Sequence, residues 1–412
     1  MNWNKMTNKA IRNRVFKAID ENQSYFKAPI IGVPATYLDE EVFYSDAPFL
    51  RNAPFISTMI SNPNHIGVHT FADHKMEDIF AGTQTLEAEL IRMMAENMFH
   101  GEENDQDGYV AAGGTEANIQ ALWIYRNYFI REKGASIDEI AIVYSADSHY
   151  SMPKGANVLN LKSIILDVDF DTRQIIQKDL EEKIDDAIEK GIKYFIVNMN
   201  MSTTMFGSVD DIERVSDFFN SKELRYKMHV DGAFGGFIYP FTKPDSPYGF
   251  HNPNISSITV DAHKMLQAPY GTGVFLCRKG LMEYTRTEEA SYVQGLDFTL
   301  SGSRSGANAV SVWMIMMAHG HAGLKVRMQN LADKAHSLKE DLDELGVESF
   351  YQDGLNIVTI KDKYVSPGIA KKYRLVSDNY GKEAKWWKIV VMKHVTQGTL
   401  DQFVEEINQS LH

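Results

Sequence analysis

The sequence predicts an α/β fold in which a largely parallel β-sheet carries helices on both faces and a smaller α+β domain follows. The first observation is that short apolar segments alternate with helical segments from Thr85 onward, the order that crossover helices between parallel strands produce. The second is a long helical region that begins after Ser301, and the third is that two β-rich stretches and a terminal helix follow it. We therefore expect an N-terminal segment (1–60), a large domain (61–315) and a small C-terminal domain (316–412).

Apolar spacing along the chain predicts the individual helices, strands and loops. Ile11, Val15 and Ile19 recur every four residues, which predicts an amphipathic helix with a basic outer face. Residues 29–64 are punctuated by Pro, Asn and Asp without strong periodicity, so loops and short pieces are expected there. The other expected elements are helices over 87–99, 113–132 and 213–220, strands at 140–144, 194–198, 228–230, 257–260 and 274–276, and β-rich stretches at 355–360 and 387–392.

The composition excludes several classes of protein. The 412 residues carry 42 Lys and Arg against 55 Asp and Glu, a net charge of −13, whereas a broad nucleic-acid surface needs clustered cationic charge. Cys277 is the single cysteine, which rules out an intrachain disulfide and a zinc site built from several thiolates, and we expect no metal site. No apolar run approaches the ~18 residues that cross a bilayer, and the basic N-terminus lacks the apolar region of a secretory signal. We expect a cytoplasmic protein that binds neither nucleic acid nor membrane.

A lysine stands where a β-rich run ends in a loop. The segment 257–264 presents Asp261, His263 and Lys264 at the end of the expected strand. Ligands of open α/β sheets bind beyond the carboxyl ends of the strands, and a lysine in a partly desolvated pocket becomes a usable amine nucleophile. The alternative is a loop lysine in water. The turn at 269–273 and the apolar strand after it weaken that alternative.

A carboxylate ends the preceding expected strand. Asp231 lies in the segment 229–236, His-Val-Asp-Gly-Ala-Phe-Gly-Gly, where small side chains after the carboxylate let a flat ring approach the backbone. Such a carboxylate could be a metal ligand, a helix cap or an ion-pair partner. Paired with a lysine at a neighbouring strand end, it can hold the nitrogen of a pyridine ring protonated and make the ring an electron sink.

Two further segments complete a candidate cofactor site. Gly113, Gly114 and Thr115 open a helix, where free backbone N–H groups and the helix dipole favour an anion. The pattern is neither G-x-G-x-x-G nor a P-loop, so dinucleotide and nucleoside-triphosphate binding lose support. His149 follows a buried strand, and its imidazole can lie flat on an aromatic ring. A simple capped helix start and a structural histidine are the alternatives.

Six ordered motifs resemble the pyridoxal-phosphate-dependent group II amino-acid decarboxylases. The motifs are Gly-Gly-Thr-Glu-Ala-Asn (113–118), Ser-His-Tyr-Ser-Met-Pro-Lys (148–154), Thr-Thr-Met-Phe-Gly-Ser-Val-Asp (203–210), His-Val-Asp-Gly-Ala-Phe-Gly-Gly (229–236), Asp-Ala-His-Lys (261–264) and Ser-Gly-Ser-Arg-Ser-Gly (301–306). The match runs from about His65 to the C-terminus. It implies fold type I, a large domain with a mainly parallel seven-stranded sheet and a small C-terminal α+β domain, with pyridoxal 5'-phosphate bound in the large domain.

The resemblance also implies a role for each motif residue. Lys264 forms the internal aldimine with the cofactor, and Asp231 pairs with the protonated ring nitrogen. His149 stacks on one face of the ring, and Ala233 lies beneath it. The residues assigned to the phosphate are Gly114, Thr115, His263 and Ser303, the last reaching the phosphate of the neighbouring subunit. Thr204 is assigned to the ring hydroxyl or to Asp231. Ser202, near Thr204, departs from the family, which usually carries glycine there.

The substrate side is assigned to His65, Arg304 and Tyr292. His65 belongs to a segment that approaches the substrate in archaeal tyrosine/aspartate decarboxylases, and a turn with buried imidazoles is the alternative. Arg304 could organise the pocket or the substrate carboxylate, or it could only bridge a loop and a helix. Tyr292 and Tyr270 are candidates for the donor that returns a proton to the substrate Cα, with core or interface roles as alternatives.

The implied activity is α-decarboxylation of an acidic or aromatic L-amino acid, giving an amine and CO2. The implied working unit is a homodimer with its active sites at the interface. One alternative is a carbon–carbon lyase of the sphingosine-phosphate lyase type on the same cofactor, and another is a non-catalytic pyridoxal-phosphate-binding regulatory protein. A cysteine desulfurase is disfavoured because Cys277 ends an apolar strand instead of lying on a loop.

Overall fold

A seven-stranded sheet organises the larger part of the molecule. The computed structural model describes residues 29, 31–32, 55, 58–59, 63–67, 81–287, 296–379 and 383–411. The strands are β1 (Gln106–Ala111), β2 (Ile140–Ser145), β3 (Lys162–Leu166), β4 (Tyr194–Asn200), β5 (Arg225–Asp231), β6 (Ile255–Asp261) and β7 (Gly273–Arg278), in the spatial order β1-β7-β6-β5-β4-β2-β3. The pairs from β6 to β3 are parallel, and β7 is antiparallel to both of its neighbours. The predicted mainly parallel seven-stranded sheet is confirmed.

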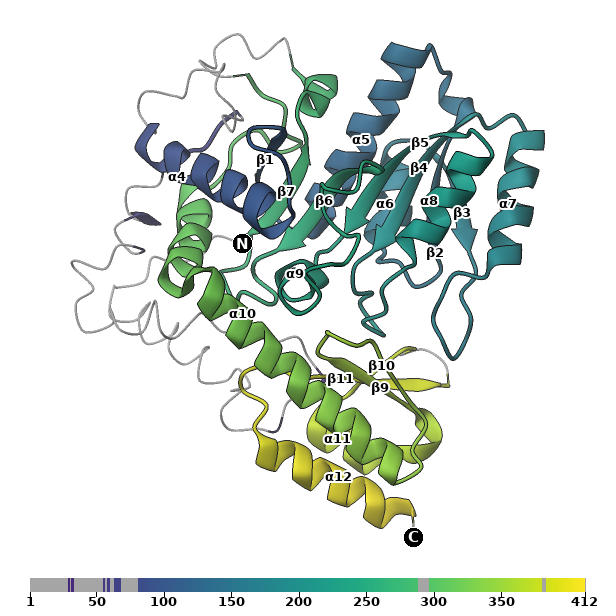
Figure 1. Cartoon of the computed structure of the whole chain (residues 1–412), viewed down its shortest axis with the longest axis vertical. Helices are drawn as coiled ribbons and strands as arrows, with labels where there is room; N and C mark the ends of the chain where they lie inside the picture. The colour runs from purple at the N-terminus through teal and green to yellow at the C-terminus, as the bar shows by residue number, and fades with distance from the viewer. Residues whose placement is uncertain are drawn as a thin grey trace, which may run out of the picture.

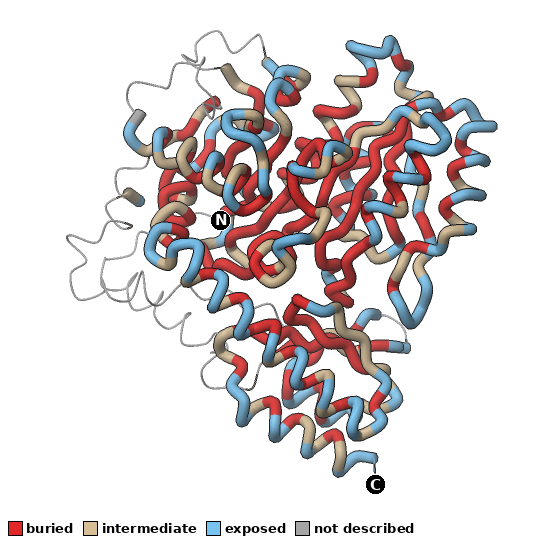
Figure 2. Tube along the Cα trace, in the orientation of Figure 1, coloured by how far each residue is buried: buried red, intermediate tan, exposed pale blue. Residues whose placement is uncertain are grey.

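Helices cover both faces of this sheet (Figure 1). They are α4 (Ala81–Arg92), α5 (Gly114–Lys133), α6 (Ser151–Val158), α7 (Gln177–Glu189), α8 (Ile212–Ser221), α9 (Tyr239–Thr242) and the long α10 (Gly306–Glu344). Successive strand side chains point to opposite faces. In β2, Ile142 and Tyr144 therefore pack in one core layer with α5 and α6, and Ala141 and Val143 pack in the other layer with α7 and α8. Burial on both faces explains why β2 is apolar from Ile140 to Tyr144 (Figure 2).

The parallel register places polar side chains at one edge of the sheet. Asn200 at the end of β4 lies opposite Asp231 at the end of β5, and Asp231 lies opposite Thr259 in β6. Asp261 then ends β6 at the same edge. The N-terminus of α5 follows β1 at this edge, because β1 runs antiparallel to β7 and so points the same way as β6. The predicted motifs are thereby brought to one place.

A smaller domain follows along α10 (Figure 1). Its elements are β8 (Ser349–Tyr351), β9 (Ile357–Lys361), α11 (Pro367–Tyr373), β10 (Val376–Ser377), β11 (Trp386–Val390) and α12 (Gln397–Leu411), and its four strands pair in the order β10-β11-β9-β8. They enclose a core of their own, separate from the two layers of the large sheet. The backbone of α10 breaks its helical path at Gly320, where φ is 62°. The expected boundary at 315/316 falls inside this helix.

Four strands carry no clear signal in the sequence and were not predicted. The first four residues of β3 are exposed or half-buried, as suits an edge strand, so they form no apolar run. β8 and β10 have only three and two residues, and β1 begins with polar residues. The expected N-terminal helix at Ile11, Val15 and Ile19 lies outside the described residues. Among the helices that the structure describes, none is long and apolar enough to cross a membrane.

Candidate active site

A cavity of about 410 Å³ lies at the sheet edge where the motifs meet. Its lining is Ala112, Gly113, Gly114, Thr115, Glu116, Asn118, His149, Tyr150, Ala233, Asp261, His263 and Lys264. Six of the predicted cofactor residues are in this set. They come from the start of α5 and from the segments after β2, β5 and β6, so four separate strand–helix connections build the site. A larger hollow of about 900 Å³ along α10 contains none of the predicted residues.

Lys264 is held beside a buried carboxylate. Its Nζ lies 3.1 Å from Oδ2 of Asp261, whose side chain is 4% exposed. Asp261 Oδ1 and His263 Nδ1 are buried and have no hydrogen-bond partner among the described residues. A buried polar atom without a partner costs about 1–3 kcal/mol, so the arrangement is suited to a polar ligand that supplies the missing contacts. The sequence had given Asp261 no role beyond its place in the motif.

The start of α5 leaves no room for a side chain at Gly114. A Cβ there would lie 2.8 Å from Oδ2 of Asp261 and 3.1 Å from the Cβ of Ala233. The first turn of a helix presents backbone N–H groups without helical partners, which suit a phosphate. Glu116 Oε2 accepts one of the nearby groups, the Ala112 N–H, at 3.0 Å. The Thr115 hydroxyl belongs to the same cavity wall. The site therefore fits a group that carries a phosphate.

His149 presents a neutral imidazole to the cavity. Its Nδ1 accepts the backbone N–H of Ser151 at 3.2 Å and lies 2.9 Å from the Ser151 hydroxyl. Burial lowers the pKa of His149, and Lys264 lowers it further, although Asp231 and Asp261 oppose the shift. The ring centroid of Tyr150, which is 63% exposed, lies 4.0 Å away. A flat neutral ring at this wall is suited to stacking on a cofactor.

Asp231 lies directly behind the cavity wall and is 6% exposed. Its Oδ2 accepts the Asn118 Nδ2 amide at 2.8 Å, and its Oδ1 accepts the backbone N–H of Ala233 at 3.1 Å. Both donors come from residues that line the cavity, so the carboxylate is fixed from its two sides. Asn118 was part of a predicted motif but had been given no role.

A buried lysine of the small domain lies near the site, although it lines neither the cavity nor the hollow beside it. Lys388 on β11 is 5% exposed, and its Nζ donates to the backbone oxygen of Thr204 at 3.1 Å. Burial lowers the pKa of Lys388 to about 8, and the positive charge of Lys264 contributes to the shift. The sequence offered no signal for it, since a lysine that alternates with Trp387 and Ile389 is typical of any half-exposed strand.

Thr204 lines an adjoining hollow instead of the cavity around Lys264. This hollow, about 500 Å³, shares His149 and Tyr150 with the cavity and extends to Trp386 of the small domain. Ser202, two positions after the end of β4, has φ at 78°, the left-handed region that favours glycine. That backbone conformation is the physical reason for glycine at this position in the resembled family.

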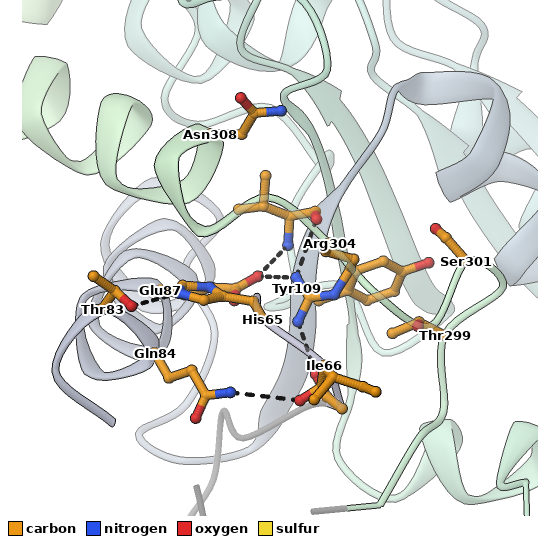
Figure 3. A network of polar contacts seen from close by, with 12 residues as sticks. His65, Ile66, Thr83, Gln84, Glu87, Tyr109, Thr299, Ser301, Arg304 and Asn308 are labelled. Carbon is orange, nitrogen blue, oxygen red and sulfur yellow. Dashed lines mark hydrogen bonds and ion pairs between the residues drawn. The ribbon is translucent and has the colours of Figure 1, made fainter. Parts of the chain in front are cut away.

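His65 and Arg304 both contact the side-chain carboxylate of Glu87, as Figure 3 shows. His65 is fully buried, its Nδ1 lies 2.6 Å from Glu87 Oε2, and its Nε2 lies 2.9 Å from the Thr83 hydroxyl. The guanidinium of Arg304 forms an ion pair with Glu87 Oε1. Burial would raise the pKa of Glu87, but Arg304 and His65 outweigh it and lower it to about 2.

Arg304 contacts three segments, which are α4 at Glu87, β1 at Val110 and the chain at Gly67. Arg304 Nη1 donates to the backbone oxygen of Val110 at 3.1 Å, and Nη2 donates to that of Gly67 at 2.7 Å. Its guanidinium also lies over the ring of Tyr109, 5.1 Å from the centroid. Neither His65 nor Arg304 lines the cavity around Lys264. Within this chain both residues bridge elements, and their assignment to the substrate stays a prediction.

The remaining predicted residues lie at the margin of the site or outside the described residues. The Ser303 hydroxyl accepts the Asn64 amide at 3.1 Å. Tyr270 is 68% exposed, with its ring centroid 5.0 Å from that of His263. Tyr292 falls outside the residues that the structure describes. Cys277 on β7 is fully buried, and burial raises the pKa of its thiol, so it stays protonated.

A sheet that presents a lysine and carboxylates at neighbouring strand ends, beside a glycine-bordered helix start and a neutral imidazole, defines an enzyme that holds pyridoxal phosphate. The chain belongs to the pyridoxal-dependent decarboxylases, since the family model described as "Pyridoxal-dependent decarboxylase conserved domain" matches residues 76–358. Its cofactor is pyridoxal phosphate and its activity is decarboxylation. The predicted family, cofactor and class of enzyme are confirmed.

Curated relatives cover almost the whole chain. A tryptophan decarboxylase of Clostridium sporogenes is 46% identical over 99% of this chain and 97% of its own length. A probable L-tyrosine/L-aspartate decarboxylase of Methanosarcina barkeri is 28% identical over 90% of this chain and 95% of its own.

Solved structures share the fold. A sphingosine-1-phosphate lyase of Burkholderia pseudomallei superimposes with a TM-score of 0.81 at 17% identity, over 100% of this chain and 92% of that one. L-methionine decarboxylase of Streptomyces sp. 590 superimposes with a TM-score of 0.77 at 20% identity, over 98% of this chain and 96% of that one. The predicted fold type I architecture is confirmed.

Proposed function

We propose that this decarboxylase acts on aromatic L-amino acids, with tryptophan as its first candidate substrate, and works as a homodimer. The observation that carries the substrate class is the 46% identity, over 99% of the chain, to a protein named tryptophan decarboxylase. The acidic class is supported only by the more distant tyrosine/aspartate relatives. The product is then an arylalkylamine, and CO2 leaves from the α-carboxylate.

Each cofactor contact has a candidate residue in the cavity wall or, for Asp231, directly behind it. When bound, pyridoxal phosphate supplies an electron sink conjugated to the substrate Cα. Lys264 offers the amine that holds it covalently, and Gly114 and Thr115 at the start of α5 offer donors to the phosphate. With the cofactor bound, Asp231 would keep a proton on the ring nitrogen, and the ring of His149 would cover one face of the cofactor ring.

Charges around Lys264 control where protons and the substrate carboxylate go. Asp261 forms an ion pair with Lys264, with 3.1 Å between Oδ2 and Nζ, so a buried carboxylate stands beside the amine. Lys388 brings a second cation from the small domain to the Thr204 side of the site. A buried cation without a carboxylate partner is costly, so we assign Lys388 to the incoming α-carboxylate. Both groups are fixed before substrate arrives, so little reorganisation is needed.

Exposed aromatic rings support a second subunit at the rim of the site. Tyr150 and Tyr270 are 63% and 68% exposed, although each packs beside a histidine of the cavity wall. Large exposed aromatic groups are enriched at protein interfaces. A homodimer in which the partner covers these rings would close the cavity and complete the phosphate site through Ser303.

The function is tested first at Lys264. Purified protein is expected to show the visible absorption band of lysine-bound cofactor and to lose it on borohydride reduction. Lys264→Ala should lose the band and at least about 10³-fold in kcat. The matched control is Lys279→Ala, an exposed lysine after β7, which should behave as wild type. A Lys264→Ala protein that keeps both the band and the activity would refute the assignment.

The substrate is tested by a panel of L-amino acids: tryptophan, tyrosine, phenylalanine, aspartate, glutamate and methionine. CO2 and amine are measured together, and tryptophan is expected to give the highest kcat/KM. Turnover of aspartate or glutamate without turnover of any aromatic substrate would contradict the substrate class.

A further inference from the structure

Five polar side chains form a continuous buried line behind the cavity. Asp231 Oδ2 accepts the Asn118 amide at 2.8 Å, and Asn118 Oδ1 lies 2.9 Å from Nε2 of His229. His229 Nδ1 lies 2.6 Å from the Ser257 hydroxyl, to which the Tyr125 hydroxyl donates. All five are at most 6% exposed. The line runs from β5 through α5 and β6, so it links the main elements under the site.

The chemistry of the end groups fixes the direction of every hydrogen bond in this line. An ionised Asp231 can only accept, so the NH2 of Asn118 faces it and the amide oxygen faces His229. His229 must therefore carry its proton on Nε2, which leaves Nδ1 to accept from Ser257. Ser257 in turn accepts from Tyr125. In each hydrogen bond of the line, the group farther from Asp231 is the donor and the group nearer to it is the acceptor.

No positive charge takes part in this line. Burial lowers the pKa of His229 to about 4, and Asp231 only partly opposes the shift, so the imidazole is neutral at physiological pH. Burial also raises the pKa of Tyr125 well above its ordinary value, so its hydroxyl stays a donor. Among the described residues, no lysine or arginine forms an ion pair with Asp231. The carboxylate is held by oriented dipoles.

Asn118 joins this line to His149. Its amide also donates to the Ser151 hydroxyl at 2.9 Å, and that hydroxyl lies 2.9 Å from Nδ1 of His149. The two N–H groups of one buried amide are thus divided between Asp231 and the serine that orients His149. A change at Asn118 would disturb both cofactor contacts, whereas a change at His229 acts on Asp231 through Asn118.

We propose that His229 and Asn118 are positioning residues that hold the Asp231 carboxylate turned toward the nitrogen of the cofactor ring. The inference rests on the proposed pairing of Asp231 with that nitrogen. A carboxylate fixed at both oxygens cannot rotate away when the ring binds, so its charge acts fully on the ring nitrogen. Without the Nε2–H donor the Asn118 amide oxygen loses the contact with His229 that orients it, and the hold on Asp231 Oδ2 weakens.

The test compares two ligands on one protein. Apoprotein is titrated with pyridoxal phosphate and with an analogue in which a CH replaces the ring nitrogen, and binding is followed by visible circular dichroism. His229→Leu should weaken the binding of pyridoxal phosphate about 10-fold or more, while the analogue changes less than about twofold. His229→Gln, whose amide can still donate to Asn118, should restore most of the difference. The wild-type preference for the natural ring should fall in His229→Leu.

Two further variants separate this role from a general loss of packing. Ser257→Ala removes one link with little change in volume, and it should show the same selective loss in a protein that folds normally. Tyr248→Phe removes a hydroxyl that is equally buried but bonds to Asn200 and Asp210, outside the line, and it should leave both affinities unchanged.

Equal losses for the two ligands in His229→Leu and Ser257→Ala would overturn the inference, because a merely structural role cannot sense the ring nitrogen. A wild-type protein that binds no pyridoxal phosphate would overturn the proposed site itself. A normal wild type with unchanged selectivity in the variants would overturn only the positioning role.

Discussion

At the scale of single residues, two side chains of the same type have different roles because their surroundings differ. Lys264 lines the cavity and has Asp261 beside it, whereas Lys388 lies nearby and, among the described residues, bonds only to the backbone oxygen of Thr204. A cation buried with so little compensation destabilises the folded state, and such strain is typical of functional sites. We therefore expect Lys388 to lower the stability of the folded protein and to raise its activity.

Replacing Lys388 by methionine should stabilise the apoprotein and impair the enzyme. Because the pKa of Lys388 is about 8 in the folded protein and ordinary when unfolded, folding at pH 7 strips water from a charged group. Lys388→Met is expected to raise the free energy of unfolding by about 1–3 kcal/mol at pH 7 and to lower kcat/KM. Urea unfolding and steady-state kinetics measure the two effects.

The lowered pKa of Lys388 makes the free energy of unfolding depend on pH. Between pH 8 and 10.5 the unfolded chain binds more protons at this residue, so the wild-type stability rises with pH there. The stability advantage of Lys388→Met should shrink over that window. Lys388→Arg keeps the charge, so its activity should persist to higher pH than that of wild type. An advantage that grows from pH 8 to 10.5 would contradict the assignment.

At the scale of elements, strand ends and one helix start build the site. β5 and β6 run in parallel and carry Asp231 and Asp261 to one edge, and α5 begins there because β1 runs the same way. The close approach of α5 to β6 depends on Gly114, where a methyl group would meet Asp261.

Gly114→Ala should weaken the binding of pyridoxal phosphate at least about 10-fold, because its Cβ would sit 2.8 Å from Asp261 Oδ2 and push the helix start away from the phosphate. Titration of the apoprotein measures the change. The matched control is Gly82→Ala on α4, where a Cβ meets nothing within 4 Å and improves helix propensity. Equal affinities in the two variants would rule out this packing role.

At the scale of the whole molecule, α10 connects the cofactor sheet with the small domain that supplies Lys388 (Figure 1). With the role proposed for Lys388, the site would be shared between domains within one chain. The proposed homodimer would extend this sharing to a second chain through Ser303, whose hydroxyl here bonds to Asn64.

Mixed dimers test this shared site. Lys264→Ala removes the amine, and Ser303→Asp places a negative charge against the partner's phosphate, so each variant alone should be inactive. If Ser303 serves the neighbouring subunit, a 1:1 mixture that is dissociated and reassociated should regain about one quarter of wild-type activity, since half of the dimers carry one intact site. Size-exclusion chromatography confirms the dimers. A mixture of dimers that stays inactive would show that Ser303 acts within its own chain or not at all.

The sequence predicted the site in part. Lys264, His149 and Ala233 were predicted as cofactor residues from strand ends followed by motif residues, and the structure brings them to one cavity. Asn118 and Lys388 were missed as site residues, because nothing local in a helix or in an alternating strand distinguishes a side chain that faces a distant loop. His65 and Arg304 were assigned to the substrate, but burial against Glu87 is a property of packing between separate elements.

The class of fold, the order of the motifs and the cofactor could be predicted from the chain alone, because apolar periodicity and short motifs are local properties. Which polar groups share one cavity depends on the tertiary structure, since the register of parallel strands sets which side chains meet. The tertiary structure also sets the protonation of these groups, because burial keeps His149 and His229 neutral and lowers the pKa of Lys388. Desolvation depends on everything packed around a group, and no short segment of sequence contains that information.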